Sequence, residues 1–107
     1  MVLSSSGCII EVVKNCLKLK KLFLTANRTV EDNDLMTITE YSSDMEQLDI
    51  LGNHRISFEA AEKVLEKCEN LKFFDVSFCG NLDKETVLRW TGRYPHVAIK
   101  RSFQEEN

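Results

Sequence analysis

Three apolar residues recur in this chain with a spacing of 26 positions. The residues that flank Phe74 alternate between apolar and polar character, which is typical of a strand with one buried face. Because equivalent positions are apolar in each copy, we interpret the pattern as a structural repeat. The three copies are Leu19, Leu22 and Leu24; Met45, Leu48 and Ile50; and Leu71, Phe74 and Val76.

The repeat extends beyond the strands. Each strand is followed by a turn, an apolar residue and a helical segment whose buried positions also recur. These positions are Val30, Ile56 and Leu82 after the turn; Leu35, Ala61 and Val87; and Val12, Ile38, Val64 and Trp90. A unit of strand, turn and helix with this length is typical of leucine-rich repeats. We therefore predict an α/β fold: a right-handed leucine-rich-repeat solenoid of about three repeats, with a short parallel sheet on its concave face and helices outside.

A chain of 107 residues is long enough for one domain. We predict that residues 1–107 form a single domain, and that its helices begin at Glu31 or Asp32, at Ser57 and at Asp83, because such side chains favour helix N-termini. Its expected parts are a helix of an incomplete first repeat (1–15), three repeats (16–41, 42–67 and 68–93) and a capping strand with a tail (94–107).

The capping strand departs from the repeat. A further step of 26 would point Lys100 and Ser102 into the core, where their polar groups would be costly to bury. We therefore expect a strand from Pro95 with Val97 and Ile99 inward, a step of 23 from Phe74 and Val76.

The other end of the predicted stack has no cap. Its first helix and strand would leave one edge exposed to water, with the apolar residues Ile9, Val12, Leu19 and Leu22. Either this edge binds another chain, which allows self-association, or further repeats precede it. The second interpretation is favoured because solenoid proteins commonly contain more than three repeats.

The four cysteines invite three interpretations: a zinc site, disulfides or structural roles. They are Cys8, Cys16, Cys68 and Cys79, and no pair has the CxxC spacing of a zinc site. Cys16 and Cys68 lie two repeat lengths apart with Ser42 midway, so we expect all three at the corner between helix and strand. We favour structural roles, and predict no metal and no cofactor.

Charge and hydropathy limit the partners. The net charge of −3 gives no reason to expect nucleic acid. No apolar run is long enough to cross a bilayer, and residues 1–15 lack the features of a secretion signal. We therefore expect an intracellular, cytoplasmic protein that does not insert into membranes.

The outward residues of the predicted sheet form the candidate recognition surface for a protein partner. In parallel strands, equivalent residues lie about 4.8 Å apart, so they form columns across the sheet. The predicted columns are Lys21, Gln47, Phe73 and His96; Phe23, Asp49, Asp75 and Ala98; and Thr25, Leu51, Ser77 and Lys100.

Two carboxylates stand side by side in this surface. Asp49 and Asp75 would repel one another unless a cation lies between them, and Phe23, Leu51 and Phe73 would surround them. This arrangement suits a Lys or Arg side chain of a partner, with its alkyl stem on the rings. Alternatively, Asp75 binds a turn amide or Lys100, and other chain segments cover the aromatic residues.

Other candidates are weaker. Lys14, Lys18, Lys20 and Lys21 could bind phosphate, although a solvated face is the simpler interpretation. His54 and His96 lack the nucleophile or acid partners that catalysis needs, so we predict no catalytic residues and no enzyme.

The cysteine spacing carries a family resemblance. The motif Cys68-x-x-Leu71-x-x-Phe74-x-Val76-x-x-Cys79-x-x-Leu82 resembles the cysteine-containing leucine-rich repeats of F-box proteins, as does the run from Cys16 to Leu24. The middle unit departs from it, because Ser42 and Asn53 replace the cysteines. The closing stretch from Tyr94 to Phe103 is similar to the C-terminus of one member of that family.

The resemblance implies the substrate-recognition part of a Skp–cullin–F-box (SCF) ubiquitin ligase receptor. In that family an upstream F-box binds the Skp adaptor, and nothing in residues 1–107 reads as an F-box. Relatives of this kind act at mitochondria, so the resemblance also allows mitochondrial association. The alternative is a leucine-rich-repeat scaffold or inhibitor unrelated to ubiquitin.

Overall fold

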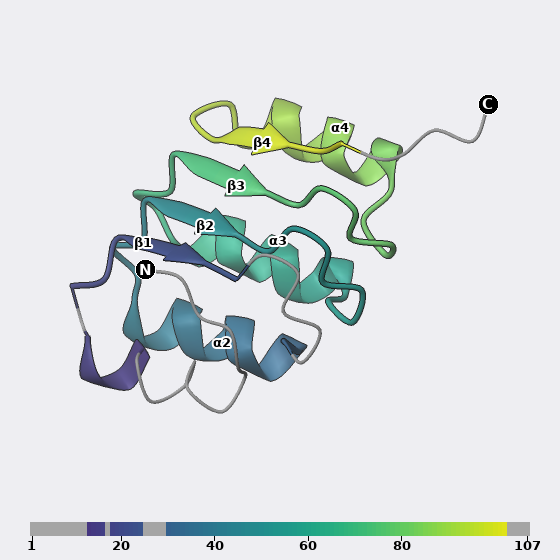
Figure 1. The fold of residues 1–107 in the computed structure, drawn as a ribbon. Helices are drawn as coiled ribbons and strands as arrows, with labels where there is room; N and C mark the ends of the chain where they lie inside the picture. The colour runs from purple at the N-terminus through teal and green to yellow at the C-terminus, as the bar shows by residue number, and fades with distance from the viewer. Residues whose placement is uncertain (1–12, 17, 25–29, 103–107) are drawn as a thin grey trace.

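The computed structural model describes residues 13–16, 18–24 and 30–102, and these form a parallel sheet with helices packed on one side of it (Figure 1). The sheet has four strands in the order β1-β2-β3-β4. The predicted α/β class and the parallel sheet are confirmed. In chain order the elements are β1 (Lys21–Phe23), α2 (Asp32–Tyr41), β2 (Gln47–Asp49), α3 (Phe58–Lys67), β3 (Phe73–Asp75), α4 (Lys84–Arg93) and β4 (Ala98–Lys100).

The first three strands are in register at the predicted spacing of 26. Leu22 lies opposite Leu48, and Leu48 lies opposite Phe74. All three side chains are fully buried. A residue of one strand therefore packs directly against its equivalent in the next.

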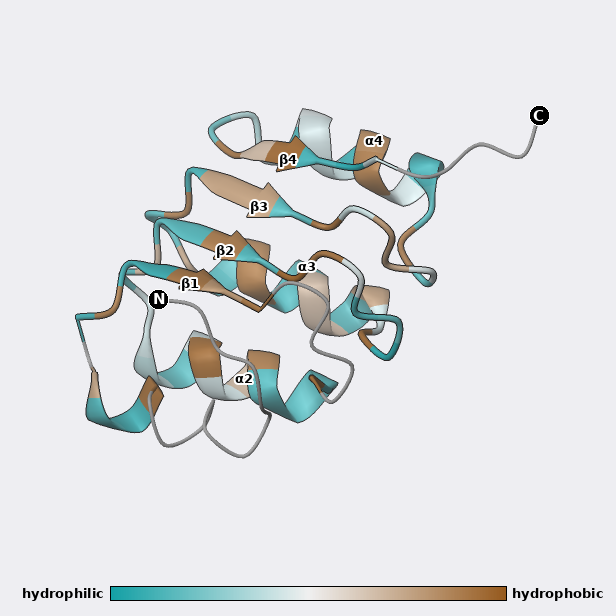
Figure 2. Ribbon diagram, in the orientation of Figure 1, coloured by the Kyte–Doolittle hydropathy of each residue, from teal (hydrophilic) through white to brown (hydrophobic). Residues whose placement is uncertain are grey.

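The core lies between the sheet and the helices. Figure 2 shows hydrophobic residues on the strands and along the helix faces turned toward the sheet. The buried helical residues at the predicted repeat positions are Leu35, Ile38, Ala61, Val64, Val87 and Trp90. Val12 lies outside the described residues, and its neighbour Val13 is buried.

The predicted exposure of the first strand is partly wrong. Leu22 is fully buried and Leu19 is half-buried, because both side chains point to the helix side and pack with the core. Ile9 lies outside the described residues. The edge at β1 is therefore a backbone edge, with one neighbouring strand among the described residues, rather than an exposed apolar one.

The corner between helix and strand is the same in each unit. The backbone carbonyl of Cys16 accepts the N–H of Leu19 at 3.0 Å, that of Ser42 accepts Met45 at 3.0 Å, and that of Cys68 accepts Leu71 at 3.1 Å. The predicted equivalence of these corners is confirmed. Tyr94 makes the same bond to Val97 at 3.0 Å, so the spacing of 26 reaches the last unit.

The predicted step of 23 at β4 is wrong. Phe74 pairs with Ile99 and Asp75 with Lys100, a step of 25. Val97 is buried at the position of Leu71, not of Phe74, so one residue fewer separates it from the inward residue of the strand. Lys72 and Phe73 separate Leu71 from Phe74, whereas Ala98 alone separates Val97 from Ile99. Val97 and Ile99 still point inward, as predicted, because a change of two positions keeps the same face.

The helix starts follow the predicted capping residues. Glu31 precedes α2 in a capping box, where its N–H donates to Asp34 at 2.8 Å. Ser57 accepts the N–H of Ala60 at 3.2 Å, and Asp83 accepts that of Thr86 at 2.9 Å.

Among the described residues, no helix is long and apolar enough to span a membrane.

Replacement of Leu48 by Ala tests the shared core. Leu48 is fully buried in the middle of the sheet, so the cavity should lower the free energy of unfolding by about 2–5 kcal/mol. Leu88→Ala is the matched control, since Leu88 is 60% exposed and its loss should cost less than about 0.5 kcal/mol. Urea denaturation followed by circular dichroism measures both. Equal losses would contradict the assignment of Leu48 to the core.

Candidate functional site

The outward residues of the strands share the sheet face opposite the helices, which we call the open sheet face. It has two rows across the sheet, set by the observed pairing. The first row is Lys21, Gln47, Phe73 and Ala98, and the second row is Phe23, Asp49, Asp75 and Lys100.

The structure changes the predicted grid at β4. Ala98 stands in the first row, where His96 was predicted, and Lys100 replaces Ala98 beside Asp75, because the true step is 25. Ser77 was predicted to face outward but is fully buried, and its Oγ accepts the N–H of Ser102 at 2.9 Å. Thr25 lies outside the described residues.

Asp49 and Asp75 lie side by side in register, as predicted. Each binds a turn amide two residues later through Oδ1: Asp49 accepts the N–H of Leu51 at 2.8 Å, and Asp75 accepts that of Ser77 at 2.9 Å. These bonds end the strands, as Asp side chains commonly do in turns. One oxygen of each carboxylate therefore has a structural role, which was the alternative interpretation for Asp75.

The three charged side chains of the second row differ in how much of each is exposed. Asp75 is only 4% exposed, whereas Asp49 is half-buried and Lys100 is exposed. Lys100 stands beside Asp75, so a cation follows the two carboxylates across the sheet and reduces their repulsion. Asp49 is the more accessible carboxylate for a partner.

The apolar part of the surface is half-buried rather than fully exposed. Phe23, Phe73 and Leu51 each show a part of their side chain, and Gln47 stands between Lys21 and Phe73. The open sheet face thus offers aromatic carbon beside acidic oxygen, the combination that favours a long cationic side chain.

A second pair of residues links successive units inside the fold. Asn53 donates through Nδ2 to the carbonyl of Leu24 at 2.9 Å, and Cys79 donates through Sγ to the carbonyl of Ile50 at 3.1 Å. Both bonds reach 29 residues back along the chain. Sequence reasoning placed Asn53 and Cys79 at one position but missed this hydrogen bond, which their shared ability to donate could have suggested.

The buried thiols are structural. Burial raises the pKa of Cys68 to about 11. Burial, and less strongly the charges of Asp75 and Asp49, raise that of Cys79 to about 11, against backbone hydrogen bonds from Asn53 and Gly52. The Cys68 thiol lies 3.9 Å from the carbonyl of Ser42. Within the described part of the chain, Cys16, Cys68 and Cys79 are free thiols, and no three metal-binding side chains cluster.

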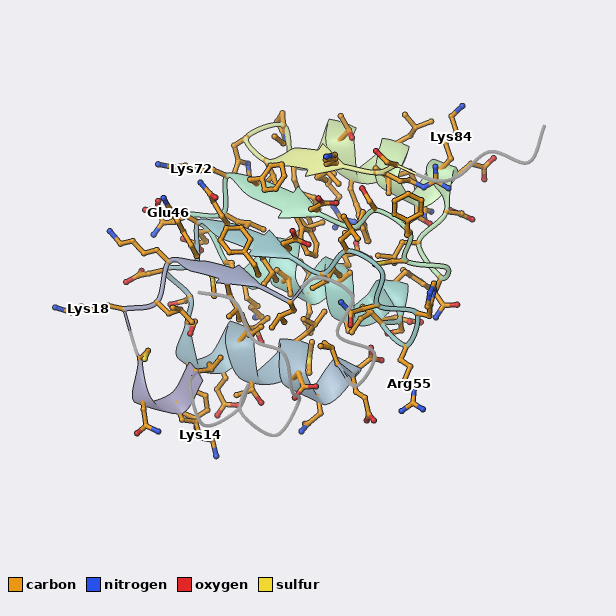
Figure 3. The ribbon with its side chains drawn as sticks, in the orientation of Figure 1. Lys14, Lys18, Glu46, Arg55, Lys72 and Lys84 are labelled. Atoms are coloured by element: carbon orange, nitrogen blue, oxygen red, sulfur yellow. The ribbon has the colours of Figure 1, made fainter. Side chains whose placement is uncertain are left out.

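The lysines near the strand starts form a mixed rather than a purely basic edge. Figure 3 shows Lys18, Glu46 and Lys72 along this side of the sheet. Lys20 lies 3.8 Å from Glu46, and Lys14 lies 5.7 Å from the ring centre of Tyr41. This pattern favours the solvated face over a phosphate site.

Comparison with known proteins tests the family resemblance drawn from the motif between Cys68 and Leu82. The chain is 41% identical over 102 residues, 95% of its length, to F-box/LRR-repeat protein 4 of Bos taurus. It is similar to a segment of an F-box/LRR protein. The predicted resemblance is therefore confirmed, including the likeness of the closing stretch to this member of the family. No family model matches the chain.

The similarity covers a small part of the relative. The chain spans 16% of the length of F-box/LRR-repeat protein 4, so the matched portion corresponds to a leucine-rich-repeat segment rather than to the whole protein. The observed parallel sheet with helices on one side fits a leucine-rich-repeat fold.

Substitutions at Asn53 test the bond between units. Asn53→Ala leaves the buried carbonyl of Leu24 without its donor and should cost about 1–3 kcal/mol of unfolding free energy. Asn53→Cys, which copies Cys79, should cost less because a thiol can donate to the same carbonyl. Chemical denaturation of both variants measures the difference. The reverse order would show that volume, not hydrogen bonding, determines this position.

Alkylation tests the cysteine environments. Iodoacetamide at pH 8 should modify half-buried Cys16 faster than Cys68 or Cys79 in the folded protein, with all three alike in urea. Since burial raises both pKa values from 9.0 to about 11, unfolded thiols ionise first, and stability should fall as the pH rises from 9 toward 11. Peptide mass mapping and denaturation at several pH values measure the two effects. Fast modification of Cys79 would contradict its burial.

Proposed function

We propose that this chain is a protein-interaction module that holds a partner on the open sheet face. The row of Phe23, Asp49 and Asp75 carries the proposal, because it combines accessible carboxylate with aromatic carbon at the centre of the sheet. A Lys or Arg side chain of the partner would bind Asp49 and lay its alkyl stem against Phe23 and Phe73. Lys21, Gln47 and Leu51 would contribute the surrounding contacts.

The architecture proposed for this role is a leucine-rich-repeat solenoid. It comprises a single domain with three repeats at 16–41, 42–67 and 68–93, preceded by a helix at 1–15 and closed by residues 94–107. The common spacing of β1, β2 and β3 supports the repeat boundaries. The matching corners at Ser42, Cys68 and Tyr94 support the point at which each unit begins.

We further propose that this module is the substrate-recognition part of an SCF-type ubiquitin ligase receptor. The similarity to F-box/LRR-repeat protein 4 supports this proposal. The module would select the protein to be ubiquitinated and would itself be non-catalytic, and an F-box elsewhere in a longer protein would bind the Skp adaptor. Such a receptor would act inside the cell, in the cytoplasm or at mitochondria.

Paired Asn substitutions test the open sheet face. Asp49→Asn with Asp75→Asn removes both charges but keeps an oxygen for the turn amides of Leu51 and Ser77, so the thermal midpoint should change little. Replacement by Lys would be less clean, because Asp75 is buried. We expect the double variant to bind the partner about tenfold more weakly, the loss of roughly one charge-assisted contact.

The experiment uses a photo-crosslinker at Gln47 to define the partner. Proteins crosslinked there are purified, and their affinities for the wild type and the double variant are compared. Glu59→Gln with Glu66→Gln removes the same charge from exposed positions of α3 and is the matched control. Equal binding by all three would rule out the open sheet face. If the chain fused to an F-box leaves the partner without ubiquitin, the scaffold alternative is favoured.

A further inference from the structure

The second row of the open sheet face carries both signs of charge. From β1 to β4 it consists of Phe23, Asp49, Asp75 and Lys100, in register across the four strands (Figure 1). Because equivalent residues of neighbouring strands lie about 4.8 Å apart, Asp49 and Lys100 are separated by about 9.6 Å along the row. A partner that lies along this row therefore meets an acid and a base at a fixed spacing.

The side chain of Lys100 is accessible to a partner. It is exposed, and among the described residues its ammonium forms no ion pair. The neighbouring carboxylate of Asp75 is only 4% exposed, and its Oδ1 accepts the N–H of Ser77 at 2.9 Å. Lys100 can therefore bind an acidic side chain of a partner, while the half-buried Asp49 binds a basic one.

The other charges near this face lie at the starts of the strands. Lys21 stands in the first row, and Lys20 lies 3.8 Å from Glu46 just before that row. Lys72 precedes the first row on β3. Since two residues of a strand span about 6.8 Å, these groups are separated from the second row by at least that length of backbone. Among the described residues, a partner along the second row faces chiefly the charges of that row.

The spacing of the row distinguishes a helix from an extended segment. In an extended segment, side chains on one face recur about every 6.8 Å, so neither the next one nor the one after it matches about 9.6 Å. In an α-helix, residues i and i+7 share one face and lie about 10.5 Å apart. A helix laid across the strands can therefore place a base over Asp49 and an acid over Lys100 at the same time.

Phe23 supplies a third point of contact. Its half-buried ring lies one strand before Asp49, on the side away from Lys100. Helix residues four positions apart lie about 6 Å apart on one face, close to the strand spacing of about 4.8 Å. An apolar residue four positions from the base can therefore pack on Phe23.

We propose that the open sheet face binds an α-helix of its protein partner, laid across the strands along the second row. A Lys or Arg of the helix lies over Asp49, an Asp or Glu seven positions away lies over Lys100, and an apolar residue four positions away on the other side packs on Phe23. This inference rests on the proposed function, which requires only a basic side chain at Asp49, and adds the secondary structure and charge pattern of the partner.

Designed helical peptides test the spacing. Each is rich in Ala and Gln and carries one Leu, one Arg four residues later, and one Glu either seven or eleven residues after the Arg. Both spacings keep the Glu on the same helix face, but eleven residues span about 16.5 Å. Chemical-shift titration of the isotopically labelled 107-residue chain measures binding. Asp49→Asn with Asp75→Asn should weaken both peptides roughly threefold.

A double-mutant cycle tests the contact with Lys100. Replacement of the Glu by Gln in the i, i+7 peptide should weaken binding to the wild type about threefold and leave binding to Lys100→Gln unchanged, as expected for one exposed ion pair. The same replacement in the i, i+11 peptide should affect neither. Lys84→Gln removes an exposed charge from α4 and is the matched control, which should behave as the wild type does.

The outcomes separate the helix from the proposed function. Equal effects of the Gln replacement on the wild type and Lys100→Gln, equal coupling at both spacings, or no binding of the i, i+7 peptide at millimolar concentration would overturn the helix. Undiminished binding of that peptide with a central Pro would assign the face to an extended segment and overturn it as well. Dependence on Asp49 without coupling to Lys100 would leave the proposed function intact, whereas binding independent of Asp49 would refute both.

Discussion

The structure depends on the contact of each residue with its equivalent one unit later. Parallel hydrogen bonds hold Leu22 against Leu48 and Leu48 against Phe74, so one unit supplies the buried surface of the next. A strand of three residues with one helix is too small to bury an apolar face alone. The core is consequently continuous along the stack, and its stability is shared among the units.

The same dependence explains how much the sequence could predict. Positions whose side chains enter the shared core must be apolar in every unit, so their spacing revealed the strands and the helices, while side-chain type revealed the capping residues. The sequence did not predict that the last unit is one residue shorter at Ala98, because a strand of only three residues offers too few inward positions to fix the register. Val97 and Ile99 point inward under steps of 23 and 25 alike, and the observed pairing of β3 with β4 separates the two.

The candidate recognition surface was harder to predict than the core, because alternation holds only while the backbone stays extended. β3 ends at Asp75, and the backbone turns away from the sheet direction by Phe78, which has a φ of 61°. Ser77 is therefore drawn into hydrogen bonds with Gly52 and Ser102, and its predicted outward position is lost. Asp49 and Asp75 remained side by side because they lie within the paired strands.

Asp49 and Asp75 also show how structure and recognition can share one side chain. A carboxylate that receives a turn amide through one oxygen is held in a fixed orientation, which lowers the entropy lost when a partner binds the other oxygen. The turn bond supports the fold whether or not a partner is present, so it offsets the repulsion of two neighbouring acids in the free protein. Asp75 is too buried for direct contact with a partner, so its negative charge would act mainly on a cationic side chain bound at Asp49. Both residues therefore terminate strands, the proposed function gives contact with the partner to Asp49 alone, and Lys100 beside Asp75 limits the acidic surface to the middle of the sheet.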